Sequence, residues 1–149
     1  MFAKTSLYDQ DTFYKPFIRD LLASKQEVVI ESPFITEKRM NVLLPIFAKM
    51  CRRNIKIIVN TRDPIEHGGD YYYQALNAIG AMQELGVIVL YTSGHHRKLA
   101  IIDRKVIYEG SLNILSFNDS CEIMRKITSD TAAKQLYKFI AIDRYIYKE

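Results

Sequence analysis

The sequence has few of the features that mark a disulfide-rich, metal-bound or membrane-spanning protein. Its 149 residues include two cysteines, Cys51 and Cys121, which form no C-x-x-C pair. Two cysteines cannot build a disulfide scaffold or a four-ligand zinc site, so we expect two reduced and mostly buried thiols. The N-terminus has no apolar signal region, and no apolar run approaches the length of a membrane span. These absences predict a soluble, cytoplasmic protein with no membrane partner.

Segments rich in proline, glycine or serine are also missing, and no repeat recurs at a fixed period. Residues 1–149 are therefore expected to form one domain, which leaves open whether a larger protein contains it. The hydrophobic fraction of 48% and the charged fraction of 26% are ordinary for a globular domain. The net charge of +4 permits an anionic partner such as nucleic acid without establishing one.

The patterns that are present alternate between helix and strand. Apolar residues at helical spacing predict helices over 12–23, from the N-cap Thr36 through Met50, over 72–85, and from Ser129 or Asp130 to about Tyr145. Short β-branched runs predict strands over 27–33, 54–61, 87–91, 98–103, 106–110 and 122–127. We expect Gly86 to end the third helix, Arg104-Lys105 to turn a hairpin, and Pro45 to kink the second helix or start it. The sequence thus predicts an α/β fold, a mixed β-sheet with helices on both faces.

The densest group of reactive side chains lies in the stretch HHRKLAIIDRKVIYEGSLN. If Lys98 begins a strand, His96 and Lys98 point to the same face and place an imidazole beside an ammonium over one pocket. An imidazole can act as nucleophile and proton carrier near neutral pH, and a lysine attracts anionic oxygens. Ser111 and Asn113 can donate hydrogen bonds to the same oxygens, and Gly110 lets the backbone approach closely. Donors outnumber carboxylates and nothing resembles a metal cage, so we expect a phosphate site.

This stretch resembles the signature of the phospholipase D superfamily, H-x-K-x-x-x-x-D followed after six residues by G-S-x-N. The matching residues are His96, Lys98, Asp103, Gly110, Ser111 and Asn113. The order of the surrounding elements is similar to that of the small bacterial endonucleases of this family and of a domain at the C-terminus of some large helicases. The resemblance implies a phospholipase D/nuclease-like α-β-α sandwich over most of the chain.

The resemblance also implies a mechanism. His96 would attack phosphorus to form a phosphohistidine, while a second imidazole would protonate the leaving oxygen from the opposite side. This chain carries one motif, so the second imidazole would come from a second subunit, and we expect a homodimer with a shared site. Lys98 and Asn113 would hold the non-bridging oxygens, with Ser111 helping to position the phosphate. This chemistry needs no metal and no cofactor.

Two acidic residues complete the set that the resemblance implies. Glu122 resembles the late acidic residue of the family, which orients the catalytic histidine. The match departs from the pattern because Ser120 stands where relatives often have asparagine. Asp103 belongs to the catalytic set with His96, Lys98 and Glu122, although we expect it to brace the strand end or the hairpin rather than to touch phosphate.

Other groups have simpler interpretations. His95 is a second candidate nucleophile, but Arg97 stands where the H-x-K pattern requires lysine. The segment DPIEHGGDYYY offers four candidate metal ligands, Asp63, Glu66, His67 and Asp70. Its proline and paired glycines instead favour a solvated loop at the rim of the site. The three tyrosines from Tyr71 to Tyr73 could stack on unpaired bases or pack the start of the next helix, and we favour packing. The scattered lysines and arginines are expected to be solvated.

Three functions are consistent with these residues. We favour a nuclease that hydrolyses phosphodiester bonds of nucleic acid, with DNA preferred over RNA, because a basic dimer suits an extended polyanion. The alternatives are a lipid phosphodiesterase of the phospholipase D type and a non-catalytic nucleic-acid-binding module fused to or associated with a helicase. The lipid enzyme is disfavoured by the short chain, and the binding module by retention of the whole motif.

Overall fold

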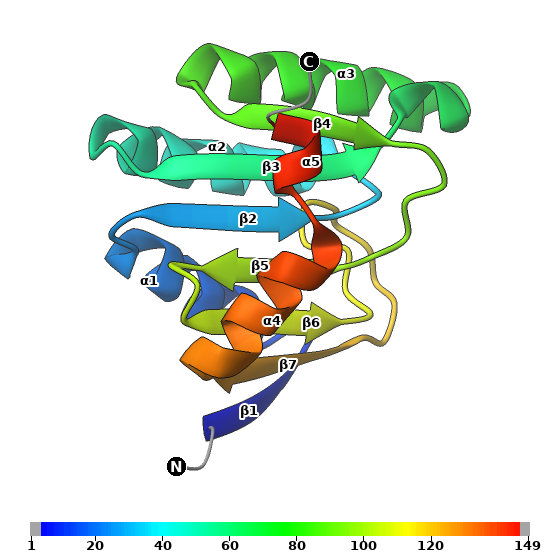
Figure 1. Ribbon diagram of the computed structural model, residues 1–149. Coiled ribbons are helices and arrows are strands. Elements are labelled where there is room, and N and C mark those ends of the chain that lie inside the picture. The colour runs from blue at the N-terminus through cyan, green and yellow to red at the C-terminus, as the bar shows by residue number, and fades with distance from the viewer. Residues whose placement is uncertain (1–3, 147–149) are drawn as a thin grey trace.

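The computed structural model describes residues 4–146, which form a seven-stranded sheet with helices on both faces (Figure 1). The strands are β1 (Lys4–Asp9), β2 (Glu27–Glu31), β3 (Lys56–Arg62), β4 (Ile88–Thr92), β5 (Leu99–Ile102), β6 (Val106–Gly110) and β7 (Ile123–Thr128). Their order across the sheet is β1-β7-β6-β5-β2-β3-β4. Strands β2, β3 and β4 are parallel and the other neighbouring pairs are antiparallel, so the sheet is mixed, as predicted.

Three helices cover one face of the sheet: α1 (Tyr14–Ala23), α2 (Glu37–Arg52) and α3 (Gly69–Leu85). Their apolar stripes share one buried cluster with alternate residues of the central strands. Phe17, Phe47 and Met82, one from each helix, have no exposed surface. Thr36 is the N-cap of α2 and accepts the backbone N–H of Arg39, as the sequence predicted.

Helix α4 (Asp130–Ile140) covers the opposite face, and the short α5 (Asp143–Ile146) follows it. The buried side chains of α4, such as Ala133 and Ile140, pack on the residues of β2, β3 and β5 that alternate with those of the first cluster. Ser129 caps α4 by accepting the N–H of Ala132 at 3.1 Å. Helices therefore lie on both faces, and the predicted fold class is confirmed.

Several predicted boundaries were wrong. Strand β1 was not predicted, because its side chains are mostly exposed and show no apolar alternation. A 3-10 turn, η1 (Pro64–Glu66), follows β3, and α3 begins at Gly69 rather than at 72. The last helix does not run unbroken to Tyr145, because Ala141 takes a left-handed conformation with φ of 53° and ends α4. Pro45 lies inside α2 and does not mark its start.

The sheet topology brings the motif and several loops to one end of the sheet. Strands β2, β3, β4 and β6 finish at this end, and β5 and β7 begin there. We call it the motif end, because the His96 segment enters β5 from it. In Figure 1 it lies on the right, where the arrowheads of β2, β3 and β4 point. Side chains separated by up to about ninety positions in the sequence therefore meet there.

Candidate active site

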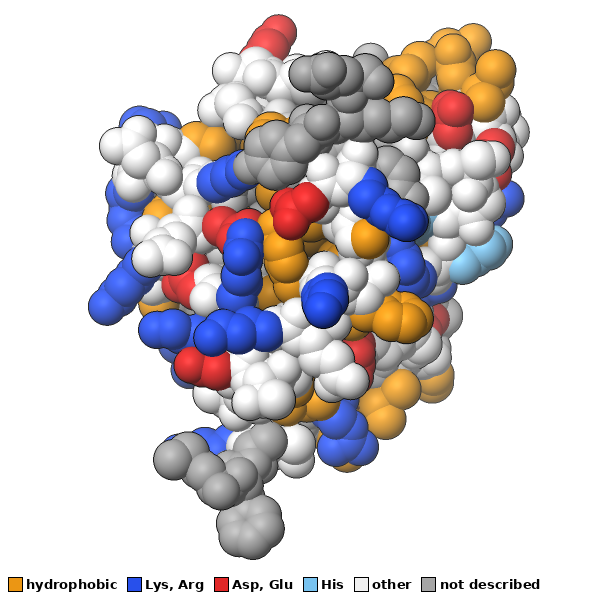
Figure 2. Space-filling view, viewed as in Figure 1, with side chains coloured by type: hydrophobic (Ala, Val, Ile, Leu, Met, Phe, Trp, Pro, Cys, Tyr) orange, Lys and Arg blue, Asp and Glu red, His pale blue; other side chains and the backbone are white. Residues whose placement is uncertain are grey.

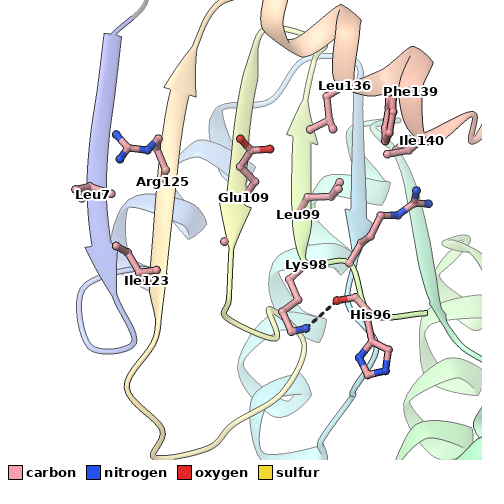
Figure 3. A pocket seen from close by; sticks show the side chains of 12 residues that line it. Leu7, His96, Lys98, Leu99, Glu109, Ile123, Arg125, Leu136, Phe139 and Ile140 are labelled. Atoms are coloured by element: carbon pink, nitrogen blue, oxygen red, sulfur yellow. Dashed lines mark hydrogen bonds between the residues drawn. The ribbon is translucent and has the colours of Figure 1, made fainter. Parts of the chain in front are cut away.

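The H-x-K segment reaches β5 as an extended connection. Residues 95–98 lie outside any strand, so the predicted strand beginning at Lys98 starts one residue later, at Leu99. The ammonium of Lys98 donates to the backbone carbonyl of His96 at 2.7 Å, while the His96 imidazole extends away from it (Figure 3). Both residues line one groove of about 590 Å³ together with Gly110. The two side chains thus share a surface, with the ammonium against the backbone rather than the ring.

The imidazole of His96 is exposed and contacts a cation that the sequence analysis missed. Nη1 of Arg62, the last residue of β3, lies 3.4 Å from Nε2 of His96. Because a guanidinium can only donate, Nε2 of His96 is the acceptor where this contact is a hydrogen bond. Arg62 is held by Glu66 at 2.8 Å, and the same carboxylate accepts the N–H of Gly94 at 3.0 and 3.1 Å. A positive charge therefore stands directly beside the proposed nucleophile.

A buried carboxylate anchors both neighbours of His96. Glu31, the last residue of β2, has no exposed surface. It accepts two hydrogen bonds from Arg97, at 2.7 and 3.2 Å, and one from Asn60 at 3.0 Å, and His95 Nε2 lies 3.4 Å from it. Burial alone would raise the pKa of Glu31, but His95, Arg97 and Asn60 together bring it below the ordinary value of 4.5. His95 is buried here, whereas His96 is exposed to solvent.

The G-S-x-N residues follow β6 at the motif end. A Cβ on Gly110 would lie 2.1 Å from the carbonyl oxygen of Ile123, so only glycine allows β6 and β7 to approach this closely. Ser111 donates its backbone N–H to Ile123, and its hydroxyl accepts the N–H of Ile123 at 2.9 Å. The carboxamide oxygen of Asn113 is buried and has no hydrogen-bond partner among the described residues. Because that oxygen is only an acceptor, the phosphate contact implied for Asn113 would have to come from its NH₂ group.

Glu122 lies at the same end, one residue before β7 begins. Its carboxylate accepts a short hydrogen bond from the Ser120 hydroxyl. Hydrogen bonds from Ser120 and Ser111, together with the charge of Lys98, hold the pKa of Glu122 below its ordinary value. Within residues 4–146, Glu122 makes no hydrogen bond to His96, so the contact implied by the family resemblance is not formed in the single chain.

Asp103 lies at the far end of β5, away from the other motif residues. Its carboxylate accepts three backbone N–H groups, from Lys25 at 2.9 Å, Gln26 at 2.8 Å and Glu27 at 3.0 Å. These contacts tie the β5–β6 hairpin to the start of β2. The structure thus gives Asp103 the bracing contacts that we expected for it, and separates it from His96 by the length of β5.

The segment after β3 is more ordered than predicted. We expected a solvated loop, but η1 and the first turn of α3 include most of it. No group of three or more histidine, cysteine or acidic side chains suitable for a metal ion occurs in the part of the chain that the structure describes. His67 instead packs its ring 4.9 Å from Phe34, with Tyr71 beside both rings. The packing that we favoured for this tyrosine is present, although Tyr71 remains 47% exposed.

The two cysteines are less buried than the sequence predicted. Both cysteines are free, but Cys121 is exposed and Cys51 half-buried, so the expectation of mostly buried thiols was wrong. Cys121 lies in the loop before Glu122 and is exposed there.

Among the described residues, no helix is long and apolar enough to cross a membrane.

Comparison with known families identifies the class of protein that this fold and site define. Residues 17–143 match the family described as cardiolipin synthase, phospholipase D-like domain. Because the match covers most of the chain, the protein belongs to the phospholipase D-like family, and the resemblance recognised in the sequence is confirmed. Membership gives the general class of its chemistry, which concerns phosphodiester bonds. No curated protein matches the chain closely enough in sequence to narrow that class.

Solved structures with the same fold include proteins of different kinds. NucT from Helicobacter pylori is 17% identical with a TM-score of 0.74, and the alignment covers 93% of each chain. Nuc from Salmonella typhimurium, a phospholipase D family member, is 14% identical with a TM-score of 0.72, covering 93% of this chain and 91% of its own. Phosphatidylserine synthase from Haemophilus influenzae is 13% identical with a TM-score of 0.72, and the alignment covers 98% of this chain but 39% of the synthase. At these identities the likeness shows the fold alone.

Proposed function

We propose that the protein is a nuclease that hydrolyses phosphodiester bonds of DNA or RNA through a phosphohistidine formed on His96. The observation that carries this proposal is the contact between the His96 Nε2 atom and the Arg62 guanidinium, 3.4 Å apart at the motif end. A cation beside an exposed, unprotonated imidazole can hold a phosphate oxygen while the nitrogen attacks phosphorus. Lys98 supplies a second positive charge at the same end.

The reaction proceeds in two displacements. In the first, Nε2 of His96 forms a bond to phosphorus, the bond from phosphorus to the leaving oxygen breaks, and a protonated second imidazole gives its proton to that oxygen. In the second, a water oxygen attacks phosphorus and the bond to Nε2 breaks. The second imidazole, now neutral, takes the proton that the water loses. The products are a phosphomonoester and a hydroxyl end, and His96 returns to its starting state.

The second imidazole comes from a second copy of the chain. The attacking and leaving groups of an in-line displacement lie on opposite sides of phosphorus, so one ring cannot serve both. The other two histidines already have contacts within the same chain, because His95 is held in the interior against Glu31 and the His67 ring lies against Phe34. A homodimer with its twofold axis near the motif end would bring two His96 side chains to face each other.

The direct test is cleavage of single-stranded DNA, duplex DNA and RNA in excess EDTA, with the wild type beside His96→Ala. We expect the wild type to cut DNA, and the variant to lose roughly 10³-fold or more of the rate. Size-exclusion chromatography with light scattering should report a dimer for both proteins. Full activity in a monomer would contradict the shared site.

A lipid assay in parallel separates the nuclease from a lipid phosphodiesterase. A short-chain phosphatidylcholine offers a phosphodiester with an apolar substituent and no bases. We expect no release of choline at protein concentrations that cut DNA. Cleavage of the lipid alone would replace the proposed function, and cleavage of neither by a folded dimer would favour a nucleic-acid-binding module, including one attached to a helicase.

A further inference from the structure

Hydrophobic side chains gather at the surface over the start of α3, on the same side of the molecule as exposed histidine (Figure 2). The exposed hydrophobic residues of this region are Ile65, Tyr71, Tyr73 and Leu76. We propose that Phe34, His67 and Tyr71, here called the aromatic platform, bind an unpaired nucleobase next to the scissile phosphate. The substrate would then be single-stranded nucleic acid. This inference rests on the proposed function and adds the substrate class to it.

The platform is built from two separate loops of the motif end. Phe34 follows β2, and His67 and Tyr71 follow β3, so the parallel pairing of these strands places the three rings together. The ring centroid of Phe34 lies 4.9 Å from that of His67 and 5.6 Å from that of Tyr71. The ring planes of Phe34 and His67 are tilted by 37°, and Tyr71 meets Phe34 edge-on at 66°, so the contacts with Phe34 hold His67 and Tyr71 in place.

Arg62 links the platform to the nucleophile. Its guanidinium contacts the His96 ring and forms an ion pair with Glu66, the residue directly before His67. Arg62 also acts electrostatically on His67, so the same guanidinium lies near both the platform and His96. A nucleotide whose phosphate lies between Arg62 and His96 would carry its base towards these rings, because base and phosphate are separated by one sugar.

The exposure of Tyr71 argues for a role beyond packing. On α3 it lies on the same side as the buried residues Ala75, Ile79 and Met82, at helical spacing from them. Unlike them it remains 47% exposed. Partial burial lowers the pKa of the neighbouring His67 below the usual 6.5, despite the hydrogen bond to the Pro33 backbone, and so favours its neutral form. A neutral imidazole and a phenol ring offer flat faces to a base, and such stacking tolerates any sequence.

Duplex DNA fits this surface less well. In a duplex each base is paired and stacked on its neighbours, so it cannot leave the helix to lie on a protein ring without an energetic cost. An unpaired base is free to do so. A lipid substrate would have no planar group to match the rings, whereas both kinds of strand carry the phosphates that Arg62 and Lys98 attract.

The experiment measures binding on His96→Ala, which removes turnover, by fluorescence anisotropy of a labelled thymidine strand. The same strand with abasic residues in place of its bases serves as a second ligand, and the duplex as a third. The double variants add Tyr71→Ala, Tyr71→Phe or Tyr73→Ala to His96→Ala. Tyr73 is the matched control, because it is an exposed tyrosine on the same helix whose ring contacts Tyr72 instead of the platform.

We expect base removal to weaken binding to His96→Ala, and to the variants with Tyr73→Ala or Tyr71→Phe, by about 10-fold or more. With Tyr71→Ala the base-containing strand should bind as weakly as the abasic strand, and the duplex should bind all four proteins equally. The platform would be overturned if removing the bases weakened strand binding to the Tyr71→Ala protein as much as it weakened binding to the other proteins. The platform would also be overturned if Tyr71→Ala weakened the binding of all three ligands equally, or if the duplex bound more tightly than the single strand.

Cleavage assays on the chain with intact His96 separate this inference from the proposed function. If binding depends on bases through Tyr71 but no strand is cut, the platform stands and the nuclease does not. If strands are cut at the same kcat/KM by wild type and Tyr71→Ala, the nuclease stands and the platform fails. Tyr73→Ala, which lies outside the platform, should leave the kcat/KM for strand cleavage at the wild-type value.

Discussion

At the scale of single residues, Glu31 shows how a buried carboxylate can stay ionised. The carboxylate has no exposed surface, yet Arg97 and Asn60 donate hydrogen bonds to it and His95 Nε2 lies 3.4 Å away. Isolated buried charges are costly, whereas one that is paired and fully hydrogen-bonded is retained in its ionised form. Because Arg97 and His95 flank His96, this one carboxylate also fixes the backbone on both sides of the proposed nucleophile.

Replacing Glu31 with glutamine should destabilise the protein at neutral pH. We expect Glu31→Gln to lower the free energy of unfolding by about 3 kcal/mol, because it leaves the Arg97 charge without its partner. The pKa of Glu31 is lower in the folded chain than its ordinary value of 4.5, so its stabilisation is complete above that pH and disappears as the pH falls through the folded value. Urea unfolding at neutral and acidic pH should therefore show the wild type and the variant converging in acid.

The matched control is Glu109→Gln, which removes an exposed carboxylate from the middle of the same sheet. It should change the free energy of unfolding by less than about 0.5 kcal/mol at either pH. A gap between wild type and Glu31→Gln that stays constant from neutral to acidic pH would show that packing, and not the charge, accounts for the effect.

The sequence predicted the motif residues but missed Glu31 and Arg62. The motif is a local spacing of residue types, so it is visible without a structure. Glu31 stood inside the run EVVIESP, which correctly predicted a buried strand, but its partners Asn60 and Arg97 lie 29 and 66 positions away. Arg62 looked like one of many scattered cations until the β3 strand placed it beside His96. Only the tertiary fold distinguishes these two from ordinary surface charges.

At the scale of elements, the β5–β6 hairpin shows how a motif residue can serve the fold. Asp103 and Arg104 both have positive φ, 54° and 52°, as the central residues of type I′ turns do. The predicted hairpin is therefore present, but its turn is centred on Asp103 and Arg104 rather than on Arg104 and Lys105. Aspartate tolerates this conformation and has a carboxylate free to accept the N–H groups at the start of β2.

Asp103→Asn should therefore weaken the fold without slowing the chemistry. The amide keeps one acceptor oxygen and tolerates positive φ, but it loses the charge that three N–H groups share, so we expect a loss of about 1–2 kcal/mol in unfolding free energy. Activity per folded molecule should remain within a few-fold of wild type below the unfolding temperature. Asp130→Asn, on the first turn of α4, is the control and should cost less than about 1 kcal/mol. A large drop in kcat for Asp103→Asn with unchanged stability would return Asp103 to the catalytic residues.

Helix ends were predictable where local chemistry determines them. Thr36, Gly86 and Ser129 all lie at the ends that their side chains or backbone favour, and Gly86 takes the left-handed φ of 99°. Strand β1 was not predictable in this way. Its residues are held by backbone pairing with β7, from Lys4 opposite Thr128 to Asp9 opposite Ile123. The local sequence of β1 does not indicate that it pairs with a strand so far along the chain.

At the scale of the whole molecule, the proposed dimer makes a quantitative prediction for mixtures of subunits. If each site needs two His96 side chains, a refolded equal mixture of wild type and His96→Ala should retain about one quarter of the wild-type rate, because random pairing gives that share of intact dimers. The rate is measured on the same DNA strand at constant total protein. An equal mixture of wild type and Tyr73→Ala should keep the full rate. A mixture with His96→Ala that retains half the rate would mean that each subunit acts alone.

The pairing of β1 with β7 also affects when the site can form. The backbone N–H of Glu122 donates to the Gln10 side chain at 2.9 Å, so the residues just after β1 hold a residue of the motif end in place. During synthesis on a ribosome, the first strand emerges long before the strand that it pairs with. The His96 segment is likewise made before Glu122 and β7 exist. If the proposed function holds, a chain still being translated should cut no nucleic acid, and it should acquire activity only when nearly all of the domain has left the exit tunnel.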